Sequence, residues 1–394
     1  MTAETITAAD TRINARWLIP VEPFGVVLEH QAVILQGSRI LAIVPQAEAD
    51  QSYRTRETLD LNQHVVLPGL INLHGHTAMS LFRGLADDLP LMTWLNDHIW
   101  PAESKFVSEQ FVADGTRLAM AEMLRTGTTT FSDMYFFPEV TAQAAHDTGM
   151  RAQICFPLMD MPTVWGSGPE EYLRKGADLI EQWQRDDYIM PAIGPHAPYT
   201  VSDDGLMRVR VLADELDIPI HMHVHETQEE IDSALAATGL RPLARLKNLE
   251  LLSPRLIAVH LTQLLPQEIE DLSEFGVNVV HCPESNMKLA SGSCPIASLQ
   301  DAAVNVALGT DGAAARTVTG RATLDLANTF LSRGVVSHGS ASFISKITSP
   351  RRGDQRPAVY IGATALRQVS EGLFLCLWTV STAMVQRTVR SLRV

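Results

Sequence analysis

Eight short apolar stretches alternate with helix-forming segments between residues 65 and 310, and this alternation constrains the fold more than any other feature. The stretches are rich in β-branched residues and are predicted strands, at residues 65–73, 127–133, 151–158, 189–195, 219–225, 256–261, 277–282 and 304–310. Eight strands with intervening helices over roughly 250 residues predict a (β/α)₈ TIM-type barrel. A doubly wound open sheet is the alternative, but no GxGxxG follows the first strand.

Capping residues mark helix boundaries between the strands. We expect helices to begin after Ser108, after Ser202 and at Pro266, because serine caps helix N-termini and proline suits the first turn. The first of these helices should stop at Gly127 and the last at Gly276, since glycine commonly ends a helix.

The chain before residue 65 has a different pattern. Short β-rich stretches at residues 12–19, 25–35 and 39–44 are broken by proline and glycine and carry no catalytic cluster. We therefore predict a small β-sandwich domain formed by the N-terminal strands in residues 1–64. A hydrolase barrel in residues 65–312 and a separate tail in residues 313–394 follow it.

Composition and charge exclude several classes of protein. The chain is 46% hydrophobic and 19% charged, as in a globular enzyme, and its net charge of −14 argues against a nucleic-acid partner. No signal peptide is predicted, and the late apolar run at residues 372–385 is too short for a bilayer. Four cysteines without CxxC spacing fit a reducing compartment and exclude a cysteine zinc site. We expect a cytoplasmic protein without a membrane partner. The sequence leaves open whether the chain forms a homo-oligomer.

Polar residues gather at the C-terminal ends of the predicted strands. They are His74, His76, Asp133, His196, His221, His223, His225, Glu226, His260, His281 and Asp311. A barrel assembles its active site at this face from the ends of several strands. His74 and His76 are two residues apart, so on a strand they share one face, about 7 Å apart at Cα, and can bind one metal ion.

The candidate ligands match what a catalytic metal needs. Zinc takes about three protein ligands and keeps a position open for water. His74, His76, Asp311 and one histidine of the fifth strand supply such a set. Periodicity alone does not choose among the three histidines that share one face of that strand, His221, His223 and His225.

Six motifs of this chain, in this order, resemble the amidohydrolase superfamily. They are PGLINLHGH at residues 68–76, GPHAPY at 194–199, HVHE at 223–226, IAVH at 257–260, HCPESNMKLASG at 281–292 and GTDGAA at 309–314. Within the superfamily the chain resembles the deaminases of 5′-methylthioadenosine and S-adenosylhomocysteine, which are related to triazine chlorohydrolases. The resemblance implies a barrel that deaminates an adenosine-type thioether hydrolytically, giving the inosine analogue and ammonia.

The resemblance also implies a ligand set and a metal. It selects His223 as the third histidine, beside His74, His76 and Asp311. Members with two metals have a carboxylated lysine on the fourth strand, and residues 189–195 contain none. One zinc ion (Zn²⁺) is therefore expected, with Fe²⁺ or Mn²⁺ as alternatives.

Roles in proton transfer follow from the same resemblance. Glu226, together with Asp311 and the neighbouring His260, is expected to be catalytic, because carboxylates beside a metal-activated water act as general acids and bases. Asn286, in the 281–292 motif, is expected only to support its loop.

Substrate-binding residues are implied as well. Trp94 and Glu103 stand nine residues apart, the spacing at which related deaminases pack a tryptophan on the ligand and bind the ribose hydroxyls with a glutamate. His196 and Glu226 are expected to contact the nucleoside too. Guanine or a triazine, the alternative substrates within the superfamily, would not need Glu103.

The resemblance stops after residue 314. Residues 314–394 carry eleven basic and three acidic side chains, a net charge of +8, so the rest of the chain carries −22. The family's Ser-Asn-Asn continuation and its later ADL-type segment are not found there. One hypothesis is a frameshift or misassembled gene near codon 314, and the alternative is a divergent C-terminal domain. This tail also motivates a different class of function, an inactive relative that binds a nucleoside without turnover.

Overall fold

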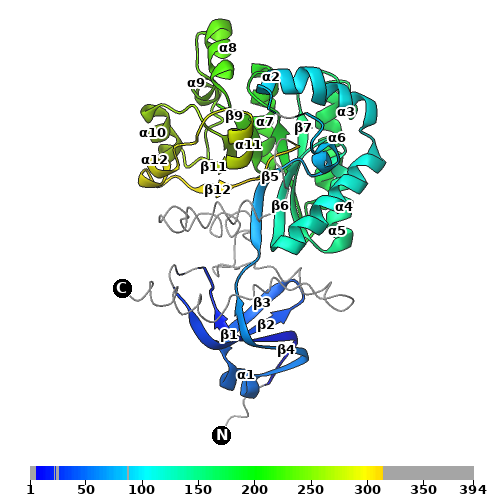
Figure 1. Ribbon diagram of the computed structural model, residues 1–394, viewed down its shortest axis with the longest axis vertical. Coiled ribbons are helices and arrows are strands. Elements are labelled where there is room, and N and C mark those ends of the chain that lie inside the picture. The colour runs from blue at the N-terminus through cyan, green and yellow to red at the C-terminus, as the bar shows by residue number, and fades with distance from the viewer. Residues whose placement is uncertain (1–5, 22, 24–25, 87, 314–394) are drawn as a thin grey trace. The chain divides into compact units, whose positions relative to one another are not determined.

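The computed structural model describes residues 6–21, 23, 26–86 and 88–313. They form two compact units, and the chain passes from one to the other between Leu70 and Ile71 (Figure 1). The domain limits inferred from the sequence remain a prediction. The basic tail from residue 314 onwards, for which a frameshift is one hypothesis, lies outside the described residues. Within the described ranges, no helix is long and apolar enough to cross a membrane.

The first unit contains a four-stranded sheet with the strand order β3-β2-β1-β4. Its elements are β1 (Thr7–Leu18), β2 (Leu28–Gln36), β3 (Arg39–Pro45), α1 (Gln46–Ser52) and β4 (Tyr53–Val66). β2 pairs antiparallel with β1 and β3, whereas β4 pairs parallel with β1. The core of this sheet is formed by Ile13, Ala15, Leu18, Val33, Leu35 and Leu61.

The three strands predicted before residue 45 are confirmed, but the sequence pattern missed β4. Only Leu61 and Val65 are buried in β4, so it lacks the apolar run that marks a strand, and it forms because its backbone pairs with β1. The prediction of one strand over residues 65–73 was wrong. β4 ends at Val66 and β5 begins at Leu70, because Pro68 between them has no N–H to pair.

The second unit is an eight-stranded parallel barrel, which confirms the predicted fold. Its strands are β5 (Leu70–Gly75), β6 (Thr128–Met134), β7 (Arg151–Leu158), β8 (Ile189–Pro195), β9 (Ile220–Val224), β10 (Leu256–His260), β11 (Asn278–His281) and β12 (Val306–Leu308). Each strand lies beside the next in the chain. A parallel bridge between Gly75 and Asp311 joins the first strand to the residues after the last. The backbone N–H groups of Thr310 and Asp311 also donate to O of His74, at 2.9 and 3.0 Å.

Helices follow the strands, and Figure 1 shows α4, α5 and α6 beside β6 and β7. The helices are α4 (Glu109–Thr126), α5 (Pro138–Thr148), α6 (Pro169–Trp183), α7 (Asp203–Leu216), α8 (Gln228–Thr238), α9 (Pro242–Asn248), α10 (Pro266–Glu274), α11 (Pro283–Lys288) and α12 (Ile296–Asp301). The predicted boundaries are confirmed: the hydroxyls of Ser108 and Ser202 cap α4 and α7, and Pro266 begins α10. Gly127 ends α4 with φ +94°, a conformation that favours glycine.

The segment between β5 and α4 positions two candidate substrate-binding residues. It forms η1 (Thr77–Phe82), α2 (Leu91–Trp94), η2 (Leu95–Ile99) and α3 (Trp100–Phe106). Met79, Phe82, Leu91, Trp94 and Ile99 are buried together in one apolar cluster. Trp94 belongs to this cluster, and Glu103 is buried in the adjoining α3. Both side chains are therefore held by packing.

Candidate active site

Strand ends bring three imidazoles and one carboxylate together. Potential ligand atoms of His74, His223, His260 and Asp311 all lie within 4.8 Å of one another, and all four side chains are buried. His74 lies in β5, His223 in β9, His260 ends β10, and Asp311 follows β12. Imidazole nitrogens with a carboxylate form a donor set that suits zinc, iron or manganese.

Asp311 connects the members of this cluster. Its Oδ1 lies 3.2 Å from Nε2 of His74 and 3.2 Å from Nε2 of His76. Its Oδ2 accepts a hydrogen bond of 2.5 Å from Oγ of Ser285. Nε2 of His223 lies 3.2 Å from Nε2 of His74. The structure thus places all four predicted ligands, His76 included, in contact around Asp311 and His74.

Hydrogen bonds from Nδ1, on the far side of two rings, turn Nε2 of each ring towards the cluster. Nδ1 of His76 donates to O of Met134 at 2.5 Å, and Nδ1 of His223 donates to O of His196 at 2.8 Å. With its N–H at Nδ1, a neutral imidazole uses Nε2 to bind a metal ion. Without a metal, Nε2 of His76 carries a proton and donates to Oδ1 of Asp311, 3.2 Å away. Metal-binding histidines typically donate their other nitrogen in this way. The residues present therefore fit a metal ion.

Burial and the charge of Asp311 set the protonation of the cluster. Burial lowers the pKa of His74 to about 4 and lowers the pKa of His223 well below its usual range. Burial opposes protonation of His76 too. Its hydrogen bond to Asp311, the charge of Asp311 and its bond to O of Met134 together outweigh this and raise the pKa of His76 to about 9. Likewise, burial acts to raise the pKa of Asp311, but its bonds to His74 and His76 hold it well below its usual range. The site therefore favours a positive charge beside Asp311.

The three histidines predicted for the fifth strand, His221, His223 and His225, have different hydrogen-bond partners. β9 ends one residue before His225, which has φ +53°, so the expectation that all three share one face was wrong for His225. Its Nε2 accepts a hydrogen bond of 3.1 Å from the backbone N–H of Leu243. Nε2 of His221 lies 2.8 Å from Nδ1 of His74. His223, the residue implied by the resemblance, is the member of the three in the cluster.

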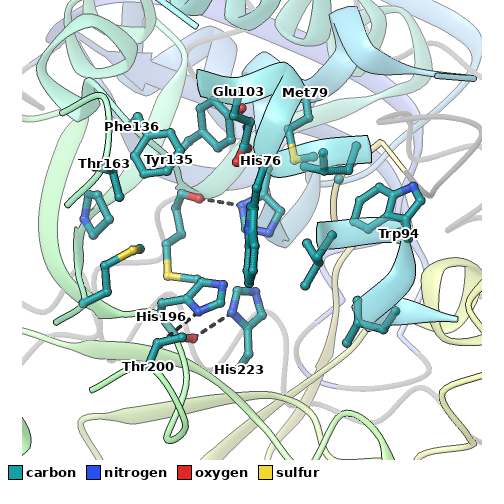
Figure 2. A pocket seen from close by; sticks show the side chains of 18 of the residues that line it. His76, Met79, Trp94, Glu103, Tyr135, Phe136, Thr163, His196, Thr200 and His223 are labelled. Carbon is teal, nitrogen blue, oxygen red and sulfur yellow. Dashed lines mark hydrogen bonds between the residues drawn. The ribbon is translucent and has the colours of Figure 1, made fainter. Parts of the chain in front are cut away.

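A cavity of about 490 Å³ lies against the cluster. His76, His223, His260 and Asp311 line it, and so do the predicted substrate-binding residues Trp94, Glu103, His196 and Glu226. Figure 2 shows Trp94 and His196 on either side of His76 and His223. His76 after β5, His223 in β9 and residues of the segment before α4 therefore face one space.

Glu226 stands at the cavity next to the cluster. Its Oε2 lies 3.7 Å from Nε2 of His260. Burial raises the pKa of Glu226, although the charge of His260 opposes the shift. The carboxylate of Glu230 holds the local backbone, because it accepts from the N–H groups of His225 and Glu226 at 3.1 and 2.7 Å. A carboxyl group whose pKa is moved towards neutrality is suited to proton transfer.

The backbone at these strand ends is strained. His225, His260 and Asp311 have φ values of +53°, +78° and +64°. Residues other than glycine rarely adopt this region, and such conformations tend to cluster at functional sites. They turn the chain sharply where each strand ends.

Some contacts of the site escaped the sequence interpretation. Oδ1 of Asn286 accepts from Nδ1 of His260 at 2.8 Å, so Asn286 does more than support its loop. Ser285, which donates to Asp311, was not singled out, although it lies in the same motif and could have been found there. Tyr135, which contacts Glu103, carries no comparable sequence signal. Asp133 accepts from N of Thr77 at 2.6 Å and so holds the chain after β5.

Fold and cluster together define a metal-dependent hydrolase built on a parallel barrel. The model of the amidohydrolase family matches residues 65–345, and the chain belongs to this family.

Three known proteins illustrate the relationship. A relative from Saccharophagus degradans, named 5-methylthioadenosine/S-adenosylhomocysteine deaminase, is 56% identical over 308 residues, 78% of this chain and 69% of the relative. A 5'-deoxyadenosine deaminase from Methanothrix thermoacetophila is 39% identical over 289 residues, 73% of this chain and 67% of the relative. The crystal structure of an adenosine deaminase from Xanthomonas campestris with bound zinc is 37% identical, with a TM-score of 0.82 and 99% of each chain covered.

Proposed function

We propose that this chain is a metal-dependent aminohydrolase that deaminates adenosine-type thioethers at C6 of the purine and releases ammonia. 5′-Methylthioadenosine and S-adenosylhomocysteine are the substrate class. One observation carries the proposal: three of the candidate metal ligands and two buried acids, Glu226 and Glu103, face the same cavity. The names of the relatives support the same class of reaction.

We assign His74, His76, His223 and Asp311 as ligands of one Zn²⁺ ion, with Fe²⁺ or Mn²⁺ as alternatives. Bound zinc supplies a water molecule whose pKa is lowered towards about 7. His260 is left out of the ligand set although it lies in the cluster. Its Nε2 lies beside the Glu226 carboxylate, an arrangement that suits proton transfer better than ligation.

Asp311 and His260 orient the attacking water, and Asp311 accepts its proton. The hydrogen bond from Ser285 holds one oxygen of Asp311, and Asn286 holds the ring of His260. The side chains of Asp311 and His260 are thus held in position before the substrate binds, as general acid–base catalysis requires.

Glu226 acts on the purine. It donates a proton to N1, which makes C6 electrophilic, and C6 is then attacked by the water oxygen. Asp311 then passes the proton taken from the water to the amino group, which leaves as ammonia, or Glu226 does so after regaining a proton from the C6 hydroxyl. The C6 hydroxyl loses its proton to a carboxylate as it becomes the carbonyl of the product. Because its pKa is raised by burial, Glu226 can hold this proton at higher pH than an exposed glutamate.

The remaining lining residues bind the nucleoside. Trp94 packs on the ligand, Glu103 accepts hydrogen bonds from the ribose hydroxyls, and His196 contacts the ribose or the 5′ substituent. The ring of Trp94 is preset for this role, since it is 6% exposed and its Nε1 donates to O of Ala86 at 3.2 Å.

A substrate panel tests the proposal. The metal-loaded protein is incubated with S-adenosylhomocysteine, 5′-methylthioadenosine, guanine and a chlorotriazine. Release of ammonia and chloride is measured, together with the absorbance change that accompanies conversion of adenine to hypoxanthine. We expect ammonia from the two thioethers. Turnover of guanine or the triazine alone would contradict the nucleoside assignment. Binding of the thioethers without product would favour an inactive relative.

A further inference from the structure

Glu103 and Tyr135 form a buried pair in the cavity wall. The Tyr135 hydroxyl donates to Oε1 of Glu103 at 2.7 Å, and the two residues are only 5% and 8% exposed. Glu103 lies in α3, and Tyr135 directly follows β6. Figure 2 shows the two side chains close together near His76. The contact therefore joins the segment before α4 to the barrel.

The direction of this hydrogen bond follows from the chemistry of the two groups. Burial raises the pKa of Tyr135 well above its usual range, and the charge of Glu103 raises it further. Tyr135 therefore keeps its proton and donates it to the carboxylate. With that proton engaged, the phenolic oxygen offers only lone pairs to a ligand.

The pair is consequently a site made of acceptors. Burial raises the pKa of Glu103 to about 7, so above this pH its carboxylate is ionised and has no donor. Among the described residues, Tyr135 is the one hydrogen-bond partner of the Glu103 side chain. Oε2 of Glu103 and the phenolic oxygen of Tyr135 can thus both accept hydrogen bonds from a ligand in the cavity. Two neighbouring hydroxyl groups, as in the vicinal diol of ribose, supply such donors from adjacent carbons.

We propose that Tyr135 is a specificity-determining residue that recognises the ribose diol together with Glu103. One hydroxyl donates to Oε2 of Glu103, and its neighbour donates to the oxygen of Tyr135. This inference rests on the proposed function, because it takes a nucleoside as the ligand. A ligand without the diol would leave both acceptors buried without a donor, which is unfavourable.

Substitution of Tyr135 by phenylalanine tests the inference, with 5′-methylthioadenosine and its 2′,3′-dideoxy analogue as paired substrates. We expect Tyr135→Phe to raise KM for the diol substrate by about 10-fold, the effect of one lost hydrogen bond in a buried site. kcat for that substrate and KM for the dideoxy analogue should stay close to the wild-type values. Bound metal should be unchanged.

Tyr188→Phe is the matched control, since it removes a hydroxyl from a tyrosine that does not line the cavity. It should leave both substrates unaffected. A Tyr135→Phe protein that loses affinity equally for both substrates would show that Tyr135 only supports the fold of the wall, and one with unchanged KM for the diol would show no role at all. Either result would overturn the inference.

Failure of the proposed function would be recognised separately. In that case the wild-type protein turns over none of the nucleosides, and equilibrium binding of adenosine and 2′,3′-dideoxyadenosine to the metal-loaded protein decides the inference instead. Tighter binding of adenosine that is lost in Tyr135→Phe supports it. Equal binding of the two nucleosides to the wild-type protein contradicts it.

Discussion

Gly75 and Asp311 form the parallel bridge that joins the first barrel strand to the residues after the last. Gly75 stands between His74 and His76, so the same bridge brings the Asp311 carboxylate to 3.2 Å from both imidazoles. The contact that closes the barrel therefore also assembles the candidate metal site. The left-handed φ of +64° at Asp311 belongs to this arrangement.

Replacement of Asp311 by alanine should abolish metal binding. The carboxylate contacts two of the candidate histidine ligands, so its loss should weaken metal affinity by more than the roughly 10- to 100-fold that follows loss of an outer hydrogen-bond partner. Metal content after dialysis, measured by elemental analysis, checks this. The exposed Asp301→Ala variant is the control and should retain metal. Stoichiometric metal in Asp311→Ala would remove Asp311 from the ligand set.

Glu226→Gln should abolish turnover while metal stays bound. The amide cannot exchange a proton with the purine, and general acid–base groups contribute about 10²- to 10⁴-fold to rate. Ammonia release under saturating substrate, alongside metal content, measures both effects. Glu229→Gln, an exposed neighbour in α8, should behave as wild type. Full activity in Glu226→Gln would exclude this carboxyl from the mechanism.

Glu103→Gln should make the protein more stable at high pH. Burial raises the pKa of Glu103 to about 7 from 4.5, so between these pH values the folded protein holds a proton that the unfolded chain has released. Stability therefore falls as pH rises through this window. The variant has no carboxyl group to ionise, so its stability should not fall in this window. It should gain at most about 3.5 kcal/mol above pH 7, since each pKa unit is worth about 1.4 kcal/mol.

Thermal unfolding midpoints of metal-free protein at pH 4, 6 and 8 measure this effect without interference from metal release. The two proteins should be equally stable at pH 4 and differ most at pH 8. Glu181→Gln, on the exposed side of α6, serves as the control. A difference that does not depend on pH would contradict the assigned pKa.

5′-Methylthioadenosine should be a better substrate than S-adenosylhomocysteine. The cavity wall includes Met159, Met161 and Val164, and no lysine or arginine lines it in the part of the chain that the structure describes. The carboxylate of the homocysteine group therefore lacks a cationic partner, and a lost charge-assisted hydrogen bond is worth about 1.5–3 kcal/mol. We expect kcat/KM to differ by roughly 10-fold or more.

A lysine placed in this wall should reduce the difference. Met161→Lys adds a cation at the cavity and should improve S-adenosylhomocysteine relative to 5′-methylthioadenosine. Met207→Lys, an exposed position in α7, controls for the added charge. Equal kcat/KM for the two thioethers in the wild-type protein would defeat this prediction.

The sequence by itself determined the barrel and part of the site, because those features depend on local patterns. Apolar runs with caps such as Ser108 and Ser202 located the strands and helices, and the i, i+2 spacing placed His74 and His76 on one face. Periodicity did not choose among His221, His223 and His225; the family resemblance selected His223, and the tertiary structure shows why it is His223 that joins them. β9 ends before His225, and the ring of His221 contacts Nδ1 of His74, on the side of that ring away from Asp311.

The contacts of Ser285 with Asp311, and of Tyr135 with Glu103, were likewise decided by the fold. A sequence pattern gives the direction of a side chain relative to its own backbone. Its distance from a side chain on another strand depends on register and on closure between Gly75 and Asp311, which no local pattern contains.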